Sequence, residues 1–410
     1  MRNTHIRYKA ALIKQMDGNN LELYLKDLFD KECKFKTEEG EEDFIREGVE
    51  TIVGDLVEKT LPDYYDMIKN DEQDIFKRIR QDKEYFKREE INCIECSTND
   101  ILKVGSYNEG TRNNFPDEFD FIFPVFCLEP TRELKTETFN ELFRKIQKDI
   151  LPPTQFVSGQ RAKRFITNDQ LAVYTSQTYR SGKIRLERTP GIKGPARELK
   201  FKYHKAMGDD KDISVDLVSA VIIKGDFSNL CQFEPLRHLA KSIGQILIVR
   251  DAFTFTEAEV KFMTQEMSLH HRTVYRLLKF LLNGNTEGEY SSYMIKMYMV
   301  RHHSENKCQE SSNLGSCILN VLDDMSLCLK NDDLPEPNES TALHVNVERY
   351  KFLALKQMVT LVDSLKTVRN SKDVYNFQEI NEQIPKQFVV KNPGLIEGVS
   401  IQMCFPKNVS

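Results

Sequence analysis

The length, composition and charge of the chain limit what it can be. At 410 residues it is long for one compact domain, and its 40% of hydrophobic residues are enough for a sizeable core in two joined lobes. Its net charge of -5 excludes a polycation that binds nucleic acid over its whole surface, so such binding needs a local basic patch. No run of about eighteen apolar residues occurs, so we expect no membrane span.

The cysteines and the N-terminus bear on where the protein works. Nine scattered cysteines favour reduced thiols in a cytoplasmic protein over a disulfide framework. Cys93 and Cys96 form a C-x-x-C, but no second pair follows at the spacing of a zinc ribbon, which disfavours a metal or redox site there. The first fifteen residues are basic and lack the apolar core of a secretory signal, which favours a basic helix face over a transit peptide.

The hydrophobic period changes twice along the chain. Helical spacing covers the first ninety residues, in 21–29, in 44–69 and in 71–90. From 91 to 223 the period shifts towards two, and the strands expected there are 101–104, 118–123 and 213–223. Helical spacing then returns, and the helices expected there are 274–282, 290–300, 317–329 and 345–368.

This order predicts an α+β fold with two lobes. We expect an N-terminal helical spine at 1–90, a lobe built on a mixed β-sheet at 91–250, a helical lobe at 251–388 and a weakly patterned tail at 389–410. A cleft between the two lobes is where a ligand is expected.

Two acids in the strand 118–123 face the same way. Because side chains alternate along a strand, Glu118 and Asp120 share one face while Phe119 and Phe121 share the other. Like charges that close repel each other unless a cation lies between them. Taken alone, such a pair is more often a half-exposed strand with two solvated acids than a metal site.

Two further segments favour the metal site. Gly105 and Ser106 directly follow the apolar run 101–104, and glycine permits close approach of a phosphate to backbone N–H groups and a hydroxyl. Asp216 lies in the otherwise apolar strand 213–223, where a carboxylate is costly unless it is paired or bound to metal. A salt-bridged core aspartate is the alternative for this residue.

Together these acids predict a catalytic centre. Glu118, Asp120 and Asp216 on adjacent strands could hold two Mg²⁺ ions, or Mn²⁺, about 3.5–4 Å apart. Such a pair activates an attacking ribose hydroxyl and stabilises the leaving pyrophosphate. Phosphoryl chemistry needs mainly positioning and charge neutralisation, so the set predicts nucleotidyl transfer, with these three residues as metal ligands and catalytic residues.

These motifs resemble those of a known family. Gly105-Ser106-Tyr107-Asn108-Glu109, Glu118-Phe119-Asp120 and Ile213-Ser214-Val215-Asp216 are similar to the catalytic core of the cyclic GMP–AMP synthase-like receptors, which are animal nucleotidyltransferases. The resemblance extends over roughly 101–334, and the helices before it resemble the family's spine. It implies a bilobed nucleotidyltransferase that binds ATP and GTP and makes a cyclic dinucleotide, cyclic GMP–AMP, as an innate immune messenger.

The resemblance also implies phosphate contacts in the helical lobe. The helix 274–282 matches one whose lysine, here Lys279, contacts nucleotide phosphates. Ser292, Tyr293 and Lys296 match a Ser-Tyr-x-x-Lys motif, in which the serine and lysine hold phosphates and the tyrosine stacks on a base. Ser292 and Lys296 lie four apart, on one face of a helix.

A third resemblance concerns the base. The segment 254–259 is similar to the family's guanine-contacting segment and implies roles for Thr254, Thr256 and Glu259. Ala252 stands where the family has an arginine, so the identity of the bound nucleotide is less firmly implied than the metal chemistry.

The family's zinc-binding thumb has no counterpart here. The interval 260–278, where it would lie, holds His270 and His271 but no cysteine, so we expect no zinc. Outside the interval, the residues expected to belong to loop and core are His302, His303, Cys308 and Cys317, with zinc a minority alternative. The missing thumb disfavours long double-stranded DNA as a trigger.

A basic segment predicts contact with nucleic acid. Between 161 and 205 twelve Lys or Arg stand against three acids, an excess that could neutralise duplex phosphates. The candidates are Arg161, Lys163, Arg164, Arg180 and Lys183. With the thumb missing, analogy favours double-stranded RNA over DNA as the activator, with an oligomer that the ligand induces. The alternative is a set of solvated faces that also contact triphosphate.

Two other functions compete with cyclic-dinucleotide synthesis. One is a catalytically silent binding or developmental scaffold, which would have no reason to retain a repulsive acid cluster. The other is a template-independent RNA nucleotidyltransferase, which shares the carboxylate chemistry but extends a polymer.

Overall fold

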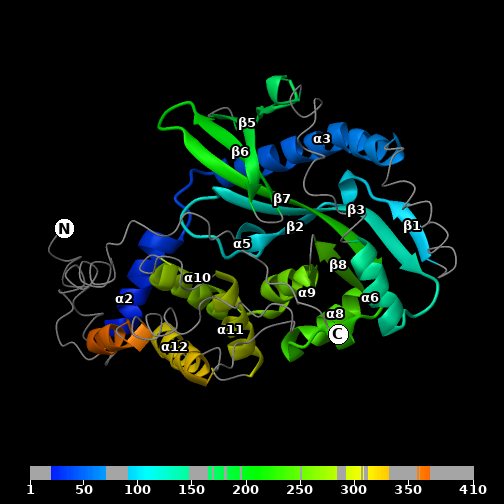
Figure 1. Cartoon of the computed structure of the whole chain (residues 1–410). Helices are drawn as coiled ribbons and strands as arrows, with labels where there is room; N and C mark the ends of the chain where they lie inside the picture. The colour runs from blue at the N-terminus through cyan, green and yellow to red at the C-terminus, as the bar shows by residue number, and fades with distance from the viewer. Residues whose placement is uncertain are drawn as a thin grey trace, which may run out of the picture. The chain divides into compact units, whose positions relative to one another are not determined.

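The structure is a computed structural model of the chain (Figure 1). The residues that it describes are 20–70, 91–146, 165–168, 170–179, 182–193, 196–249, 252–283, 292–305, 308, 313–331, 358–359 and 361–369. They form two compact units. The sheet unit runs from Phe35 to Glu266, and the helical unit comprises the described residues up to Lys34 and from Met267 onward.

One nine-stranded mixed sheet forms the centre of the sheet unit (Figure 1). The strands are β1 (Ile91–Glu95), β2 (Leu102–Val104), β3 (Glu118–Pro130), β4 (Val173–Tyr174), β5 (Gly182–Lys193), β6 (Ala196–Lys205), β7 (Lys211–Lys224), β8 (Gln245–Val249) and β9 (Ala252–Thr254). Their order is β1-β3-β7-β6-β5-β4, with β2 on β3, β8 on β7 and β9 on β8. β3 and β7 pair in parallel, and the other pairings are antiparallel.

β3 and β7 bury alternate side chains, as the sequence pattern predicts. Their buried residues at alternate positions are Phe119, Phe121 and Phe123 on β3, and Ile213, Val215 and Leu217 on β7. β3 continues beyond the predicted end at Phe123, because a register shift between Pro124 and Phe126 accommodates the proline within the strand. The outer half of β3 is then buried, with Val125 and Leu128 inaccessible to solvent.

Helix α3 (Glu41–Asn70) packs against β4 and β5. Glu41, at its start, is 2% exposed and accepts hydrogen bonds from the Tyr203 hydroxyl and the Lys205 ammonium, each at 3.0 Å. The Phe44 ring lies 4.8 Å from that of Tyr179. A paired buried carboxylate and an aromatic cluster therefore fix the first turns of α3 to the sheet.

The sheet unit also contains four further α-helices that bear on the site or the sheet. They are α5 (Gly105–Asn108), α6 (Thr136–Lys145), α8 (Glu234–Ile243) and α9 (Thr256–Lys261). α5 directly follows β2, and α8 leads into β8 through Gly244, whose φ of +68° ends the helix in the left-handed region.

The helical unit packs α2 (Asn20–Leu28), α10 (Leu269–Asn283), α11 (Ser292–Ser304) and α12 (Leu314–Asn331). α10 contacts both α11 and α12, and α12 contacts α2 (Figure 1). A Cβ at Gly315 would lie 2.8 Å from the Leu21 side chain, so the glycine permits the close approach of α12 to α2. Residues 361–369 are also helical.

The predicted α+β class with a mixed sheet is confirmed. So are helices within 21–29, 44–69, 274–282 and 317–329, while 71–90 and most of 345–368 lie outside the described residues. The two compact units meet in sequence at Glu266 and Met267, and the first described helix joins the later ones, whereas we had expected boundaries at 90 and 250. Of the helices described, none has the length and apolarity that a bilayer crossing needs.

Candidate active site

The parallel pairing of β3 with β7 brings the predicted acids to one part of the sheet. Asp120 lies directly opposite Asp216, and Glu118 lies opposite Ser214. Neighbouring strands are about 4.8 Å apart, so the aspartates are adjacent. Glu118 is on the same face of β3 as Asp120, because side chains two positions apart along a strand point to the same side. The fold therefore gathers acids that are far apart in sequence.

Gly105 lies against the centre of this group. Val104, the last residue of β2, is paired with Asp120, so the chain leaves the strand beside that carboxylate. Gly105 has φ +77°, and a Cβ there would lie 1.8 Å from Asp120 Oδ2. Glycine is therefore required at this position both for its backbone conformation and for the space that the carboxylate occupies.

The surroundings of Asp120 strongly favour its protonated form. Burial, followed by the charges of Glu118, Asp216 and Glu109, raises the pKa of Asp120 to about 7, and the charge of Arg112 opposes this rise. A cation beside this carboxyl would favour its ionised form and lower the pKa again. A raised pKa in a group of acids is typical of metal and catalytic sites.

Arg112 is a component of the site that the sequence did not indicate. Its guanidinium donates to Glu118 Oε2, and it also binds Asp117 Oδ1 through Nε at 3.0 Å and Nη2 at 2.5 Å. Arg112 lies in the loop 109–116, between α5 and β3. In this structure the loop thus supplies a cation to one of the predicted metal ligands.

β6 adds a further acid, Glu198, beside Asp216. Glu198 is opposite Asp216, and its carboxylate accepts from Ser214 Oγ at 3.3 Å and pairs with Lys200 Nζ at 2.5 Å. Sequence inspection had counted Glu198 only as an acid within a basic segment. Alternation along 196–205 could have placed it on the same face as Lys200, but its strand partner was not evident from sequence.

The donor set suits a hard divalent cation. Carboxylate oxygens are the ligands that Mg²⁺ and Mn²⁺ prefer, and Glu118, Asp120 and Asp216 offer no nitrogen or sulfur. Among the described residues, the three carboxylates do not form a group whose ligand atoms all lie within metal-binding reach of one another. Since Arg112 holds Glu118, we expect that pair to open when a cation binds.

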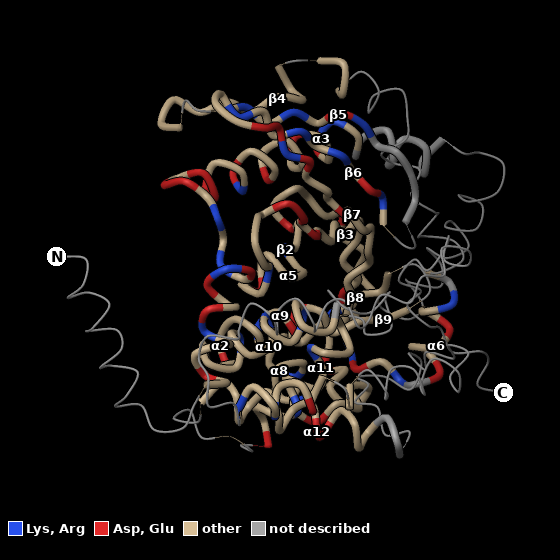
Figure 2. Tube along the Cα trace, turned by 90° about the vertical axis from the view of Figure 1, so that its left-hand side faces the viewer, with Lys and Arg blue, Asp and Glu red and all other residues tan. Residues whose placement is uncertain are grey.

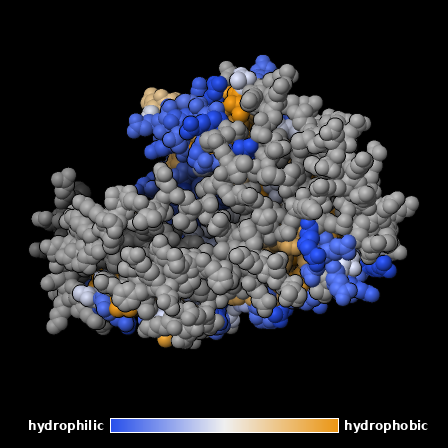
Figure 3. Space-filling model, in the orientation of Figure 1, coloured by the Kyte–Doolittle hydropathy of each residue, from blue (hydrophilic) through white to orange (hydrophobic). Residues whose placement is uncertain are grey.

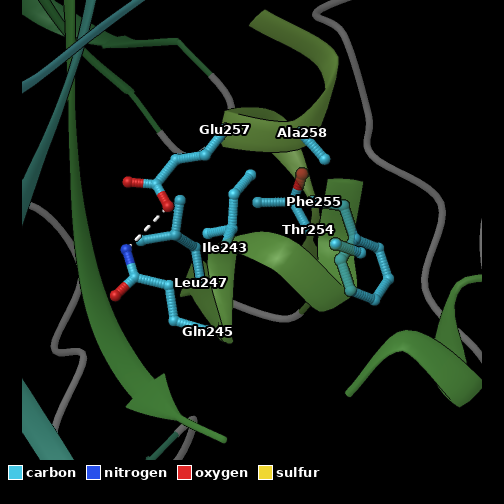
Figure 4. Close-up of a pocket in the computed structure, with 8 residues that line it drawn as sticks. Ile243, Gln245, Leu247, Thr254, Phe255, Glu257 and Ala258 are labelled. Atoms are coloured by element: carbon cyan, nitrogen blue, oxygen red, sulfur yellow. Dashed lines mark hydrogen bonds between the residues drawn. The ribbon is translucent and has the colours of Figure 1, made fainter. Parts of the chain in front are cut away.

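The predicted base-contacting segment borders a narrow hollow of the sheet unit (Figure 4). Thr254 lines it, and its hydroxyl lies 2.7 Å from that of Thr256. On the other side Gln245 Nε2 donates to Glu257 Oε2 at 2.6 Å, and burial raises the pKa of Glu257. Glu259 is 3% exposed. The two threonines are therefore brought together, whereas Glu259 is buried.

The predicted phosphate-contacting residues lie close together within the helical unit. Tyr275 of α10 donates from its hydroxyl to the Ser292 carbonyl at 3.0 Å, which ties α10 to the start of α11. Lys279 Nζ is 5.5 Å from the Tyr275 ring, and Lys296 Nζ is 5.2 Å from the Tyr293 ring. Each lysine is 8% exposed, so both ammonium groups lie over aromatic faces with little access to solvent.

Four of the five candidate nucleic-acid contacts, Arg161, Lys163, Arg164 and Arg180, lie outside the described residues. Lys183 is exposed on β5. Lys and Arg outnumber the acids along β5 and β6, and the surface there is hydrophilic (Figures 2 and 3). Part of this charge is already paired, since Lys202 binds Asp212 at 2.8 Å and Lys205 binds Glu41 at 3.0 Å. The free positive charge on these strands is therefore smaller than the sequence count suggests.

No protein-family model matches the chain, and no curated protein matches it in sequence. Solved structures do. Vibrio cholerae DncV cyclic AMP-GMP synthase with the linear intermediate 5' pppA(3',5')pG is 12% identical, over 91% of this chain and 98% of that one, with a TM-score of 0.48. The CdnC:HORMA-deltaN complex of E. coli MS115-1 is 9% identical over 88% and 96%, with a TM-score of 0.44. Elizabethkingia meningoseptica CdnE cyclic dinucleotide synthase with GTP and Apcpp is 13% identical over 65% and 84%, with a TM-score of 0.35. At this level the likeness carries no argument about the reaction.

Proposed function

We propose that the chain is a metal-dependent nucleotidyltransferase that makes a cyclic dinucleotide, cyclic GMP–AMP, from ATP and GTP. The observation that carries the proposal is the pairing of Asp120 with Asp216 in parallel register, with Glu118 on the same face of β3. Like charges held this close to one another are costly unless they serve a cation.

Glu118, Asp120 and Asp216 are the residues that would hold Mg²⁺ or Mn²⁺. When bound, the metal would neutralise charge on the triphosphate and lower the pKa of the attacking ribose hydroxyl. The protein's own contribution is to position these carboxylates from two strands of a single sheet. Gly105 supports this role because its missing side chain leaves room for Asp120 Oδ2.

Other residues would bind the nucleotides. The Ser106 hydroxyl and the ammonium groups of Lys279 and Lys296 are suited to phosphate oxygens. Thr254 and Thr256 would present paired hydroxyls to a base, at the 2.7 Å separation noted above. Ser292 and Tyr293 would complete the phosphate and stacking contacts, with Tyr293 38% exposed and so accessible to a base.

Activation by double-stranded RNA is part of the proposal. Its support is the basic excess in 161–205, of which Lys183 is exposed, and the missing zinc-binding thumb. The contact between Arg112 and Glu118 gives such an activator a target: a ligand that moves the loop 109–116 would release a carboxylate for metal.

The test is a product analysis. The purified protein is incubated with labelled ATP and GTP, Mg²⁺ or Mn²⁺, and a panel of RNA and DNA duplexes, and the products are separated by chromatography. We expect a cyclic dinucleotide with RNA duplexes, lost in Asp216→Asn. Asp212→Asn is the matched control, because Asp212 lies on the same strand with its side chain 83% exposed.

Each other outcome points to a different function. Elongated RNA would replace the proposal with a template-independent RNA nucleotidyltransferase. No product with any duplex or metal would leave a silent scaffold. A cyclic dinucleotide made equally with DNA and RNA would keep the reaction and remove the preference for RNA.

A further inference from the structure

Four metal-type side chains meet in the helical unit, away from the residues assigned above. They are His271 on α10, His302 on α11, Cys308 in the connection after α11, and Cys317 on α12. One ligand atom from each lies within 4.8 Å of all the others. All four residues are buried, and the most accessible, Cys308, is 9% exposed. The sequence predicts loop and core positions for His302, Cys308 and Cys317, with zinc as a minority alternative, and their meeting favours that alternative.

The distances suit a tetrahedral ion. His302 Nε2 is 3.0 Å from Cys308 Sγ and 3.4 Å from Cys317 Sγ. With Zn–N of about 2.0–2.1 Å and Zn–S of about 2.3 Å, the edges of a tetrahedral Cys₂His₂ site are roughly 3.3–3.8 Å. The observed separations lie near these edges, so small movements of side chains would complete the geometry.

His271 supplies a second, independent observation. Its Nε2 is buried and, among the described residues, has no hydrogen-bond partner. Its other nitrogen, Nδ1, is 2.6 Å from His303 Nδ1, a contact in which one of the two rings donates. If His271 Nδ1 carries the proton, Nε2 presents a lone pair, which is the form that binds a metal. Burial and the neighbouring imidazoles lower the pKa of His271 to about 3, so the ring is neutral.

Polar groups behind the four residues complete the arrangement. Asp324 Oδ2 lies 3.9 Å from His302 Nδ1, on the side of that ring opposite to the cysteines. Asn320 Nδ2 donates to Cys308 Sγ at 3.8 Å. A carboxylate behind a ligating histidine and an N–H group on a thiolate are the outer contacts that orient and stabilise zinc ligands.

We propose that His271, His302, Cys308 and Cys317 form a structural zinc site that fastens α10, α11 and α12 together. Nitrogen and thiolate donors select zinc over magnesium. Four protein ligands leave no open position, so the site is structural and not catalytic. On binding, two protons leave the thiols of Cys308 and Cys317, and their two negative charges balance that of Zn²⁺.

The proposed zinc site lies at a different place in the chain from the zinc-binding thumb of the family that the sequence resembles. The thumb interval 260–278 contributes only His271, and the other three ligands come from the segment 302–317. The expectation of no zinc rested on the absence of cysteine from that interval alone. Because the helices that zinc would join also carry Lys279 and Lys296, metal loss would loosen their relative positions.

Metal content of the full-length protein tests the proposal without any assay of activity. After dialysis against metal-free buffer with a thiol reductant, mass spectrometry of metals should find about one zinc per chain, as a closed Cys₂His₂ site holds its ion. Replacement by Co²⁺ should give the visible absorption of a tetrahedral ion and thiolate charge transfer. Less than about a tenth of an equivalent of zinc, or a Co²⁺ spectrum without thiolate bands, would overturn it.

Two ligand variants, each with a matched control, locate the ion. Cys317→Ser should lose the zinc, and Cys328→Ser on the same helix should retain it. His271→Gln should lose it, and His270→Gln at the preceding residue should retain it. Asp120→Asn should also retain it, which separates this site from the carboxylates. If a ligand variant does not fold, the wild-type cobalt spectrum still decides. A Cys308–Cys317 disulfide in zinc-free protein purified without reductant, with no zinc uptake after reduction, would contradict the proposal.

Discussion

The half-buried carboxylate group of the sheet unit and the buried His/Cys group of the helical unit present opposite arrangements of polar side chains. Burial and the charges of the neighbouring carboxylates raise the pKa of Asp120 to about 7, and Arg112 holds Glu118. The His and Cys groups can all be neutral, and their ligand atoms already lie within 4.8 Å of one another.

This difference concerns what each site must do with its ion. A site that fixes an ion permanently benefits from complete, closely spaced ligands and a closed shell. A site that takes up metal together with a substrate benefits from ligands that are strained without the cation and that another group can hold apart. If both proposals hold, the protein combines a closed site for structure with an open one for reaction.

The largest expected effect comes from Asp120→Asn or Asp216→Asn. Either change removes a charge that would hold metal, so dinucleotide synthesis should fall on the order of 10³-fold. Zinc content should stay unchanged, as measured on the same preparations. Asp212→Asn should leave synthesis near that of the wild type. Loss of zinc together with activity would break the separation between the two sites.

The second-largest expected effect is a pH dependence of stability that comes from the carboxylate group and not from the His/Cys group. In chelator, Asp120 titrates at about 7 in the folded protein against 3.8 as its ordinary value. The unfolded chain loses this proton first, so the free energy of unfolding should fall by roughly 4 kcal/mol as pH rises from about 4 to about 7. Below pH 4 this contribution is fully present.

Urea unfolding of Asp120→Asn at several pH values measures that contribution, because the amide does not titrate. The free energy of unfolding of the variant should change much less with pH, and in chelator at pH 8 it should exceed that of the wild type. A wild-type curve with the same slope as the variant would show that Asp120 ionises normally.

Gly105→Ala should have a smaller but clear effect. The left-handed backbone costs a non-glycine residue about 1–2 kcal/mol, and the new Cβ would collide with Asp120. Displacement of that carboxylate should reduce synthesis on the order of 10²-fold. Gly54→Ala is the control, since a Cβ there meets nothing within 4 Å. Full activity of Gly105→Ala would show that the carboxylate has room to move.

Arg112→Ala should have the smallest effect and the opposite sign. Without the guanidinium, no side-chain cation from Arg112 competes with Mg²⁺ for Glu118, so Mg²⁺ affinity should rise by a few-fold, about 1 kcal/mol. Activator-independent synthesis should rise with it. Calorimetric titration with Mg²⁺ and assays without duplex measure both. A fall in synthesis would instead assign Arg112 to substrate binding.

Local sequence patterns predicted the parts of the site that depend on one strand. Glu118 and Asp120 were placed on one face by alternation alone, and β3 and β7 were identified by their apolar residues. The direct pairing of Asp120 with Asp216 could not be read from the chain, because register depends on the connection between the strands.

The His/Cys group shows where such reasoning fails. Its four residues come from three helices and one connection, so no single spacing links them. Helical periodicity predicted α10, α11 and α12 but not which faces meet at their ends. Arg112 was missed for a similar reason: its partners Asp117 and Glu118 lie across a turn of irregular backbone, where periodicity gives no orientation.

The parallel pairing of β3 with β7 affects when the carboxylate group can assemble during folding. A parallel neighbour cannot form through a tight turn, so β7 reaches β3 only after the chain has traced β4, β5 and β6. Contacts between such distant segments form slowly, because the entropy of closing the loop is lost before the pair stabilises it. A growing chain on the ribosome therefore holds Glu118 and Asp120 long before Asp216 emerges. Nucleotidyl transfer, if it is the reaction, could not start before β7 has been made and paired.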